Sequence, residues 1–128
     1  MRLKVIVVLP SKYSVKETVD LLVILLQQAD MTIYARINRQ AEAKWHSRVT
    51  RPLEFIFFDN PRISAPMFER NPIMAICFPA RIIAWEDEIG RCRIAFRDPL
   101  DTMKEFGVDR EDCQWPDLQP AIALMISE

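Results

Sequence analysis

Runs of apolar residues broken by short polar segments predict strands and helices in alternation along the chain. The stretch "LKVIVVL" (Leu3–Leu9) is apolar on both alternating faces, which is typical of a central strand, and Pro10 is expected to end it. Three more segments have strand character, the last of them a hairpin that turns at Gly90: Met31–Asn38, Leu53–Phe58 and Arg81–Asp98. The pattern therefore predicts five strands.

Helical periodicity appears between the strands and near the C-terminal end. Ser14 stands three residues before Glu17, which is capping-box spacing, so a helix is predicted over Val15–Ala29. Further helices are predicted to open at Asp98-Pro99 and over Asp117–Ile126. The order β-α-β-β-(short helices)-β-β-α predicts an α+β fold, with helices gathered on an antiparallel or mixed sheet.

The first predicted helix is apolar on every side. Six consecutive apolar residues, Leu21–Leu26, advance about 100° each and so run round the whole helix. A sheet covers one side only, and burying a leucine-sized side chain is worth about 1.5–3 kcal/mol, so the far side is expected to be covered as well. Either the C-terminal helix or a second copy in a homodimer supplies this cover. In both cases Leu21, Ile24 and Leu25 are expected to be sheltered from water.

Composition narrows the class of protein. The 128 residues fit one domain, 1–128, and a net charge of −1 is not the footprint of a nucleic-acid binder, so no nucleic-acid partner is expected. Three cysteines without C-x-x-C spacing and a single histidine predict no metal site and reduced thiols, hence a cytoplasmic location. The N-terminal apolar run is too short for a signal peptide or a membrane span, so no membrane association is expected.

A proline-punctuated segment between Phe55 and Pro72 is the main candidate for a binding site. Asp59 is expected to take a left-handed turn, a short helix can start at Pro66, and Asn71 can cap a second helix. The free N–H groups of such a helix start, with arginines nearby, suit a small anion. The alternative is a corner with a purely structural role. The candidate ligand-binding residues are Arg51, Asn60, Arg62, Arg70 and Asn71.

Candidates for catalysis are few. His46 has no evident partner and is interpreted as a surface or half-buried structural residue. Cys77 and Cys92 lie in apolar surroundings and are interpreted as core residues, whereas Cys113, in a charged segment, is the candidate for an exposed thiol. Three arginines of the predicted hairpin face outward, either to pair with the acidic turn or to meet a ligand: Arg91, Arg93 and Arg97.

Three segments carry a family resemblance through their order and spacing: "RPLEFIFFDNP" (Arg51–Pro61), "APMFERNP" (Ala65–Pro72) and "FPARIIAWEDEIGRCRIAFRDP" (Phe78–Pro99). They resemble the bacterial family catalogued as domain of unknown function 302, and the resemblance spans most of the chain. It implies a compact α+β fold with helices on one face of a single, curved, mainly antiparallel sheet. It implies no established activity, cofactor or catalytic residue. The chain departs from the family pattern at Asp59, where a glycine is usual, and at Asn38 and Arg39, where an aspartate-histidine pair is frequent.

Two hypotheses of function follow. The first is a non-enzymatic cytoplasmic domain that self-associates as a homodimer and binds a small anionic or apolar ligand between the sheet and the proline-rich loop. The alternative is an enzyme that acts on a small metabolite, with arginines as substrate-binding groups and a carboxylate or Cys113 as the reacting group. The sequence shows neither an acid–base pair nor a nucleophile arrangement, which favours the first.

Overall fold

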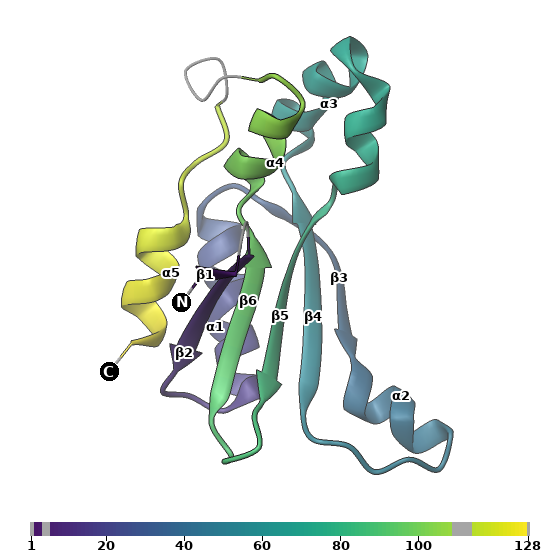
Figure 1. Ribbon diagram of the computed structural model, residues 1–128, viewed down its shortest axis with the longest axis vertical. Helices are drawn as coiled ribbons and strands as arrows, with labels where there is room; N and C mark the ends of the chain where they lie inside the picture. Colours follow the sequence, from purple (N-terminus) through teal and green to yellow (C-terminus); the bar gives the residue numbers. More distant parts are fainter. Residues whose placement is uncertain (1, 4–5, 109–113, 128) are drawn as a thin grey trace.

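One antiparallel sheet with helices against it forms the computed structural model, which describes residues 2–3, 6–108 and 114–127 (Figure 1). The strands follow the order β1-β2-β6-β5-β4-β3, and every neighbouring pair is antiparallel. Their bounds are β1 Arg2–Leu3, β2 Ile6–Ser11, β3 Thr32–Asn38, β4 Leu53–Asp59, β5 Ala80–Glu86 and β6 Cys92–Arg97. The predicted α+β fold with five antiparallel strands is confirmed, and the two-residue β1 is added at one edge.

The helices leave one face of this sheet open. Their bounds are α1 Val15–Gln28, α2 Arg39–Trp45, α3 Pro61–Arg70, the 3-10 helix η1 Pro72–Cys77, α4 Pro99–Glu105 and α5 Gln119–Ile126. In Figure 1, α1 lies behind the sheet with α5 to one side, α3 and α4 gather at the top, and α2 extends at the bottom. The predicted packing of helices on one face is confirmed, and we name the other side the open face.

One apolar stripe holds α1 against the sheet. The helix begins at its predicted cap, because the Glu17 N–H donates a hydrogen bond to Ser14 Oγ at 3.1 Å. Leu22 and Leu26 are completely buried, in the same core cluster as Ile56 of β4. Burial of each such side chain is worth about 1.5–3 kcal/mol, so this stripe fixes the position of α1 on the sheet.

The far side of α1 is covered only in part. α5 packs against α1, and Leu25 is half-buried against the core, which agrees with cover by the C-terminal helix. Leu21 is half-buried as well, whereas 52% of Ile24 is exposed. The expectation of shelter for all three is therefore wrong at Ile24. The reason is length, since α5 has 8 residues and α1 has 14.

A bulge in β3 turns one arginine toward the helices. Strict alternation would place Ile33 and Ala35 on the same face, but the register with β4 shifts between them. After the shift, Arg36 lies opposite Ile56, a core residue, and its side chain reaches α1. The bulge therefore positions a charged group at the boundary between sheet and helix.

The proline-punctuated segment forms its helices at other positions than predicted. α3 begins at Pro61, and Pro66, the predicted start, lies inside it. Asn60 caps this helix by accepting a hydrogen bond from the Arg62 N–H at 3.1 Å. Proline at the first helical position after an Asn cap is a favoured start, and this explains the earlier beginning. Asn71 precedes η1 as predicted, but its side chain makes no capping hydrogen bond.

The ends of the chain also differ in detail from the prediction. Leu3 belongs to β1, which pairs with β2, and β2 continues through Pro10 to Ser11. Pro10 is tolerated inside the strand because β1 pairs only with the first residues of β2, which leaves an edge at Pro10. The last helix begins at Gln119, two residues later than predicted. The hairpin turn at Gly90 is confirmed, with a left-handed φ of 84°.

Candidate functional site

The open face of the sheet is apolar at its centre. Phe55 and Phe57 of β4 and Ile83 and Trp85 of β5 are half-buried there, and Ala95 of β6 lies opposite Ile83. The residues between them in sequence point the other way and form the core: Ile56, Ile82, Ala84 and Ile94. No described helix packs across this face as α1 does on the other, so the apolar centre faces solvent.

A cavity of about 530 Å³ lies at one end of the open face. The sheet contributes Arg81, Ile83, Ala95 and Arg97 to its wall. The remaining wall comes mainly from η1 and the prolines near it: Ile76, Cys77, Phe78, Pro79 and Pro99. Small-molecule sites commonly enclose about 300–1,000 Å³ with mostly apolar walls, so this open-face cavity has suitable dimensions for a ligand.

Two arginines stand side by side in the open-face cavity. Because Ile82 pairs with Phe96, the ladder places Arg81 beside Arg97 on adjacent strands. Like charges at neighbouring ladder positions repel; Glu105 of α4 already pairs with Arg97, and a negative group bound beside Arg81 would relieve the repulsion that remains. The pair is therefore better suited to an anion than to a cation.

Each arginine of this pair has a fixed neighbour. The Arg81 guanidinium lies 4.8 Å from the centre of the Phe57 ring, a cation–π contact. Arg97 forms an ion pair with Glu105 of α4. Arg81 is exposed beside this ring, so its N–H groups remain able to donate to an anion. Arg81 has no carboxylate partner among the described residues.

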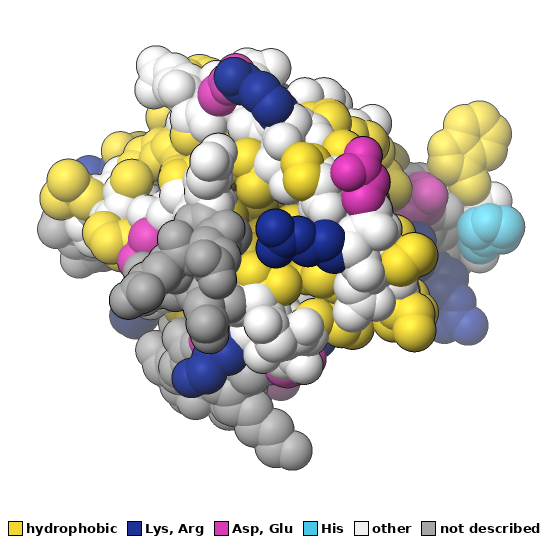
Figure 2. All heavy atoms as spheres, turned by 90° about the horizontal axis from the view of Figure 1, so that it is seen from above, with side chains coloured by type: hydrophobic (Ala, Val, Ile, Leu, Met, Phe, Trp, Pro, Cys, Tyr) yellow, Lys and Arg dark blue, Asp and Glu magenta, His cyan; other side chains and the backbone are white. Residues whose placement is uncertain are grey.

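The structure brings three of the predicted site residues together in another groove. Arg62, Arg70 and Asn71 line a cavity of about 500 Å³ along one side of α3, with Met67 and Phe106 among its apolar residues. Figure 2 looks onto this end of the molecule and shows basic side chains among hydrophobic ones. We call it the α3 groove. Its arginines differ, since Arg62 pairs with Asp30 and Arg70 has no ion-pair partner among the described residues.

The two other predicted residues lie elsewhere. Asn60 is buried, with 7% of its surface exposed, and its side chain serves as the cap of α3. Arg51 precedes β4 at the other end of the sheet, where it bonds to Glu86 at 3.2 Å and to the Glu88 carbonyl at 3.1 Å. These contacts give both residues a structural role, and neither lines the open-face cavity or the α3 groove.

The candidates for catalysis are spread over the chain. His46 is exposed at the C-terminal end of α2. Cys92 is buried as predicted, and burial raises the pKa of its thiol in spite of a contact with the Thr18 hydroxyl. Cys77 is half-buried, packs on the core and also lines the open-face cavity, whereas Cys113 lies outside the described residues. In the described part of the chain, no three His, Cys, Asp or Glu residues cluster as a metal site.

Of the three hairpin arginines, Arg93 pairs with the acidic turn through its side chain, as one of the two predicted alternatives has it. Arg97 pairs with Glu105 of α4 instead, and the Arg91 side chain has no ion pair among the described residues. Asp87 Oδ2 accepts from Arg93 Nε at 2.9 Å, and Asp87 Oδ1 accepts from the Arg91 N–H at the same distance. The backbone N–H of Arg91, followed by the Arg93 side chain, lowers the pKa of Asp87 below its ordinary value. Arg97 instead lines the open-face cavity. For Arg97, the other predicted alternative, contact with a ligand, therefore stays a prediction.

Sequence reasoning did not single out Arg81, although a signal was present. Arg81 and Arg97 are equally far from residue 89 at the tip of the hairpin, so a correctly centred turn places them opposite each other. What sequence could not show is that η1 and the prolines near it form a wall of a cavity beside this pair.

Asp59 is buried at the end of β4 and does not take the left-handed turn predicted for it. Its carboxylate accepts hydrogen bonds from the Asn60 N–H at 2.7 Å and from Ser64 Oγ at 2.8 Å. The described non-glycine residues with positive φ are Asp30 and Ser47, at the ends of α1 and α2. A glycine is therefore not required at position 59 by backbone conformation.

The pKa of Asp59 predicts a pH-dependent effect of its replacement. Burial raises this pKa above its ordinary value, although the two hydrogen bonds act in the other direction. A carboxyl with a raised folded pKa stabilises most below its unfolded pKa, and this contribution is lost as the pH rises through the folded pKa. Asp59→Asn should therefore be less damaging at pH 7 than at about pH 3.5, as measured by urea unfolding at both values. A greater loss of stability at pH 7 would contradict this.

A comparison with protein families decides where the chain belongs. The model of the family described as domain of unknown function DUF302 matches residues 7–120, which is most of the chain. The chain is a member of the DUF302 family. The resemblance of its hairpin and proline-rich segments is thereby confirmed. A crystal structure of an uncharacterized DUF302 protein from Bacillus stearothermophilus has the same fold, with a TM-score of 0.72, 13% identity, and coverage of 97% of this chain and 88% of that one.

Curated relatives of this DUF302 protein are longer chains. Fluoride-specific ion channel FluC 1 of Brucella suis biovar 1 (strain 1330) and of Brucella abortus biovar 1 (strain 9-941) are each 28% identical to it over 94 residues. The match covers 73% of this chain but only 37% and 35% of those relatives, so the chain spans about a third of their length. Among the residues described in the DUF302 protein, no helix is both long and apolar enough to cross a membrane.

Proposed function

We propose that this DUF302 domain binds a small ligand that carries an anionic group and an apolar body, and that the site is the open-face cavity. The observation that carries the proposal is the pair Arg81 and Arg97 at one wall of an otherwise mainly apolar cavity. Arginine donates in a planar fork, so a carboxylate or a phosphate between the two side chains accepts two or more charge-assisted hydrogen bonds. Ile83 and Ala95 then face the apolar body of the ligand.

The length of the relatives supports a binding role over an enzymatic one. In the relatives named as fluoride-specific ion channels, the matched segment occupies only about a third of the chain. A domain of this kind joined to a longer chain suits an accessory module that responds to a small molecule. For this chain, ligand binding without catalysis is the simplest function consistent with its cavity and with the absence of a nucleophile–base pair among its described residues.

Loss of either cavity arginine should weaken binding. Calorimetric titration with hexanoate, benzoate and phenyl phosphate, beside hexanol and hexylamine, tests the anionic requirement directly. A hydrogen bond to a charged group is worth about 1.5–3 kcal/mol, so Arg81→Gln and Arg97→Gln should each raise Kd about tenfold or more. A ligand at a hundred times its Kd should also stabilise the wild-type protein by about 2.7 kcal/mol.

Two control variants locate the site. Arg91→Gln removes an exposed arginine of the same hairpin that does not line the cavity, and it should leave Kd unchanged. Arg70→Gln removes an arginine of the α3 groove. Weaker binding in Arg70→Gln, with unchanged binding in both cavity variants, would assign the ligand to the α3 groove. Equal affinity for hexanol and hexanoate would overturn the anionic requirement.

Self-association is the second part of the proposal. Apolar side chains outside the core support it, above all Trp45 of α2, which is 87% exposed, and Val49, which is 95% exposed. Large exposed aromatic groups are typical of interfaces. We therefore expect light scattering to give the mass of a homodimer at micromolar concentrations, and Trp45→Lys to shift it to the monomer. A monomeric mass of the wild-type protein at every concentration would contradict the proposed self-association.

A further inference from the structure

Side chains on the open face of the sheet form rows that cross the strands. Residues paired on neighbouring strands point to the same side of a sheet, so the ladder fixes which residues share a row. The middle row is apolar and half-buried throughout: Ile37, Phe55, Ile83 and Ala95. The row toward the open-face cavity contains Phe57, Arg81 and Arg97, and the row toward the hairpin turn contains Leu53, Trp85 and Arg93. We call these the middle row, the cavity row and the turn row.

Most charges on the open face are matched within the chain. Three of its arginines have carboxylate partners: Arg39 with Glu42, Arg93 with Asp87 and Arg97 with Glu105. Arg81 stacks on Phe57 and has no carboxylate partner among the described residues. Beyond the turn row, Arg51 pairs with Glu86, while Arg91 and Glu88 are opposite in charge. The face is therefore apolar with balanced ion pairs, apart from the single positive charge of Arg81.

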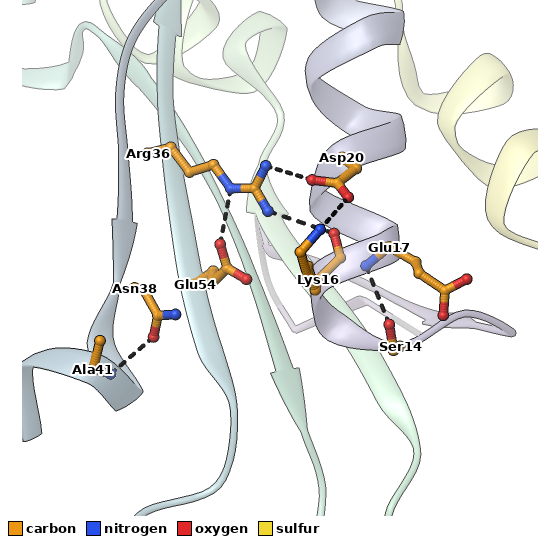
Figure 3. A network of polar contacts seen from close by, with 8 residues as sticks. All are labelled: Ser14, Lys16, Glu17, Asp20, Arg36, Asn38, Ala41 and Glu54. Atoms are coloured by element: carbon orange, nitrogen blue, oxygen red, sulfur yellow. Dashed lines mark hydrogen bonds and ion pairs between the residues drawn. The ribbon is translucent and has the colours of Figure 1, made fainter. Parts of the chain in front are cut away.

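The helix side of the same strands offers a weaker surface for a partner. Its charges are also matched within the chain, since Arg36 of β3 bonds to Glu54 and Asp20 (Figure 3). The large apolar side chains exposed on α1 and α5 are Ile24 and Leu124, one on each helix. The open face, which Figure 1 shows toward the viewer, instead presents a continuous apolar row.

A second copy of the chain complements the open face when a two-fold axis runs across the strands, along the middle row. The middle rows of the two copies then meet, and the cavity row of each copy meets the turn row of the other. Arg81 lies against Trp85 of the second copy, a favourable cation–π arrangement. The Arg97–Glu105 pair lies beside the Arg93–Asp87 pair of the second copy, with two charges of each sign. An axis along the strands would instead set Arg81 against Arg81, so the charges select the first axis.

The size of the face and its two ends fit such a pairing. Five strands of six or seven residues make a face of about 24 by 21 Å, or about 500 Å² before side-chain relief is counted. Stable interfaces bury about 600–1,000 Å² per partner. The remainder is available at the ends, because Ile76 is exposed at the cavity end, and Trp45 and Ile89 are exposed at the other end. The selected axis brings the cavity end of one copy to the turn end of the other.

We propose that two copies pack through their open faces about a two-fold axis along the middle row, and that each copy places its Trp85 beside Arg81 of the other. This inference rests on the self-association proposed above and names its interface. Arg81 lines the open-face cavity, so the second copy adds a wall to the ligand site. Trp85 itself does not line the cavity within one chain.

Isotope-filtered NMR of the wild-type protein tests the interface. In a sample that mixes labelled and unlabelled chains, nuclear Overhauser effects between the two kinds of chain report only contacts between copies. We expect them between Ile83 and Ile83 and between Trp85 and Arg81. A dimer by light scattering whose contacts between copies centre on Ile24 and Leu124 would overturn the open-face interface while self-association stands. A monomer at every concentration would remove both.

A matched pair of variants gives a second test. Ile83→Lys sets two lysines against each other across the axis and should raise the dimer Kd about a hundredfold or more, since hot-spot losses occur in both copies. Ile24→Lys makes the same substitution on α1 and should change that Kd by about threefold or less. Circular dichroism confirms that each variant is folded. A folded Ile83→Lys protein with the wild-type dimer Kd would overturn the proposal, and the wild-type NMR contacts decide it if this variant does not fold.

Discussion

Leu22→Ala should lower the free energy of unfolding by about 3–5 kcal/mol, since leucine truncations in closed cores cost this much through lost transfer energy and the cavity left behind. Leu22 is 0% exposed and lies where α1 meets the sheet, in one core cluster with Ile56 and Ile82. The β-strands beneath cannot collapse into the space without breaking their ladders. Urea unfolding followed by circular dichroism gives the difference directly.

Ile24→Ala is the matched control for this prediction. It removes a similar volume from the same helix at a position that is 52% exposed. Less than about 1 kcal/mol should be lost there, because half of the side chain already meets water. Equal costs at the two positions would show that α1 does not pack on the sheet through the Leu22 stripe.

The second large effect concerns the ion pair between Arg36 and Glu54. Removing one partner of a buried pair costs about 3–5 kcal/mol, because the remaining charge is left buried without compensation. Arg36 is 32% exposed in its side chain, so water relieves part of this cost. We expect Glu54→Ala and Arg36→Met each to destabilise, and Arg36→Met more strongly, by about 2–4 kcal/mol, since it isolates a carboxylate that is 9% exposed.

A double-mutant cycle isolates the pair. The variant with both Arg36→Met and Glu54→Ala leaves no unpaired charge at the site, so its loss should be well below the sum of the single losses. Urea unfolding of the four proteins gives the coupling energy. Additive losses would mean that the two side chains do not depend on each other. The pH offers a second readout: the hydrogen bond from Arg36, with that from Lys16, lowers the pKa of Asp20, so its contribution to stability fades as the pH falls through that pKa.

Hydrophobic patterning was sufficient for most of the fold. The apolar runs of Leu53–Phe58 and of the hairpin predicted strands that the structure confirms, and Cys92, which alternates with Ile94 and Phe96, is buried as predicted. The capping box at Ser14 located the start of α1. The predicted helix start and strand faces were wrong where two local sequence signals favour different structures. Asn60 followed by Pro61 is as good a helix start as Pro66, and the shift in β3 has no simple sequence signal.

The candidate site was less accessible to sequence reasoning. Arg62, Arg70 and Asn71 do lie together, because they share one side and the end of a single helix. Arg51 was grouped with them by residue type, yet it lies at the other end of β4. The open-face cavity forms where η1 packs beside the sheet. This contact joins segments that are far apart in the sequence, so no local sequence pattern predicts it. Glu54 was read as part of an apolar strand, and its ion pair with Arg36 depends on the bulge in β3, which the sequence did not reveal.

The most direct test of the account is to map where a small amphipathic anion binds. Amide and methyl NMR spectra of the isotope-labelled protein, recorded during a titration with benzoate, locate the contact residue by residue. We predict the largest shifts at Arg81, Ile83, Ala95 and Arg97, with those shifts lost in Arg97→Gln. Shifts centred on the α3 groove, or no shifts at millimolar benzoate, would contradict the assignment of the open-face cavity as the binding site.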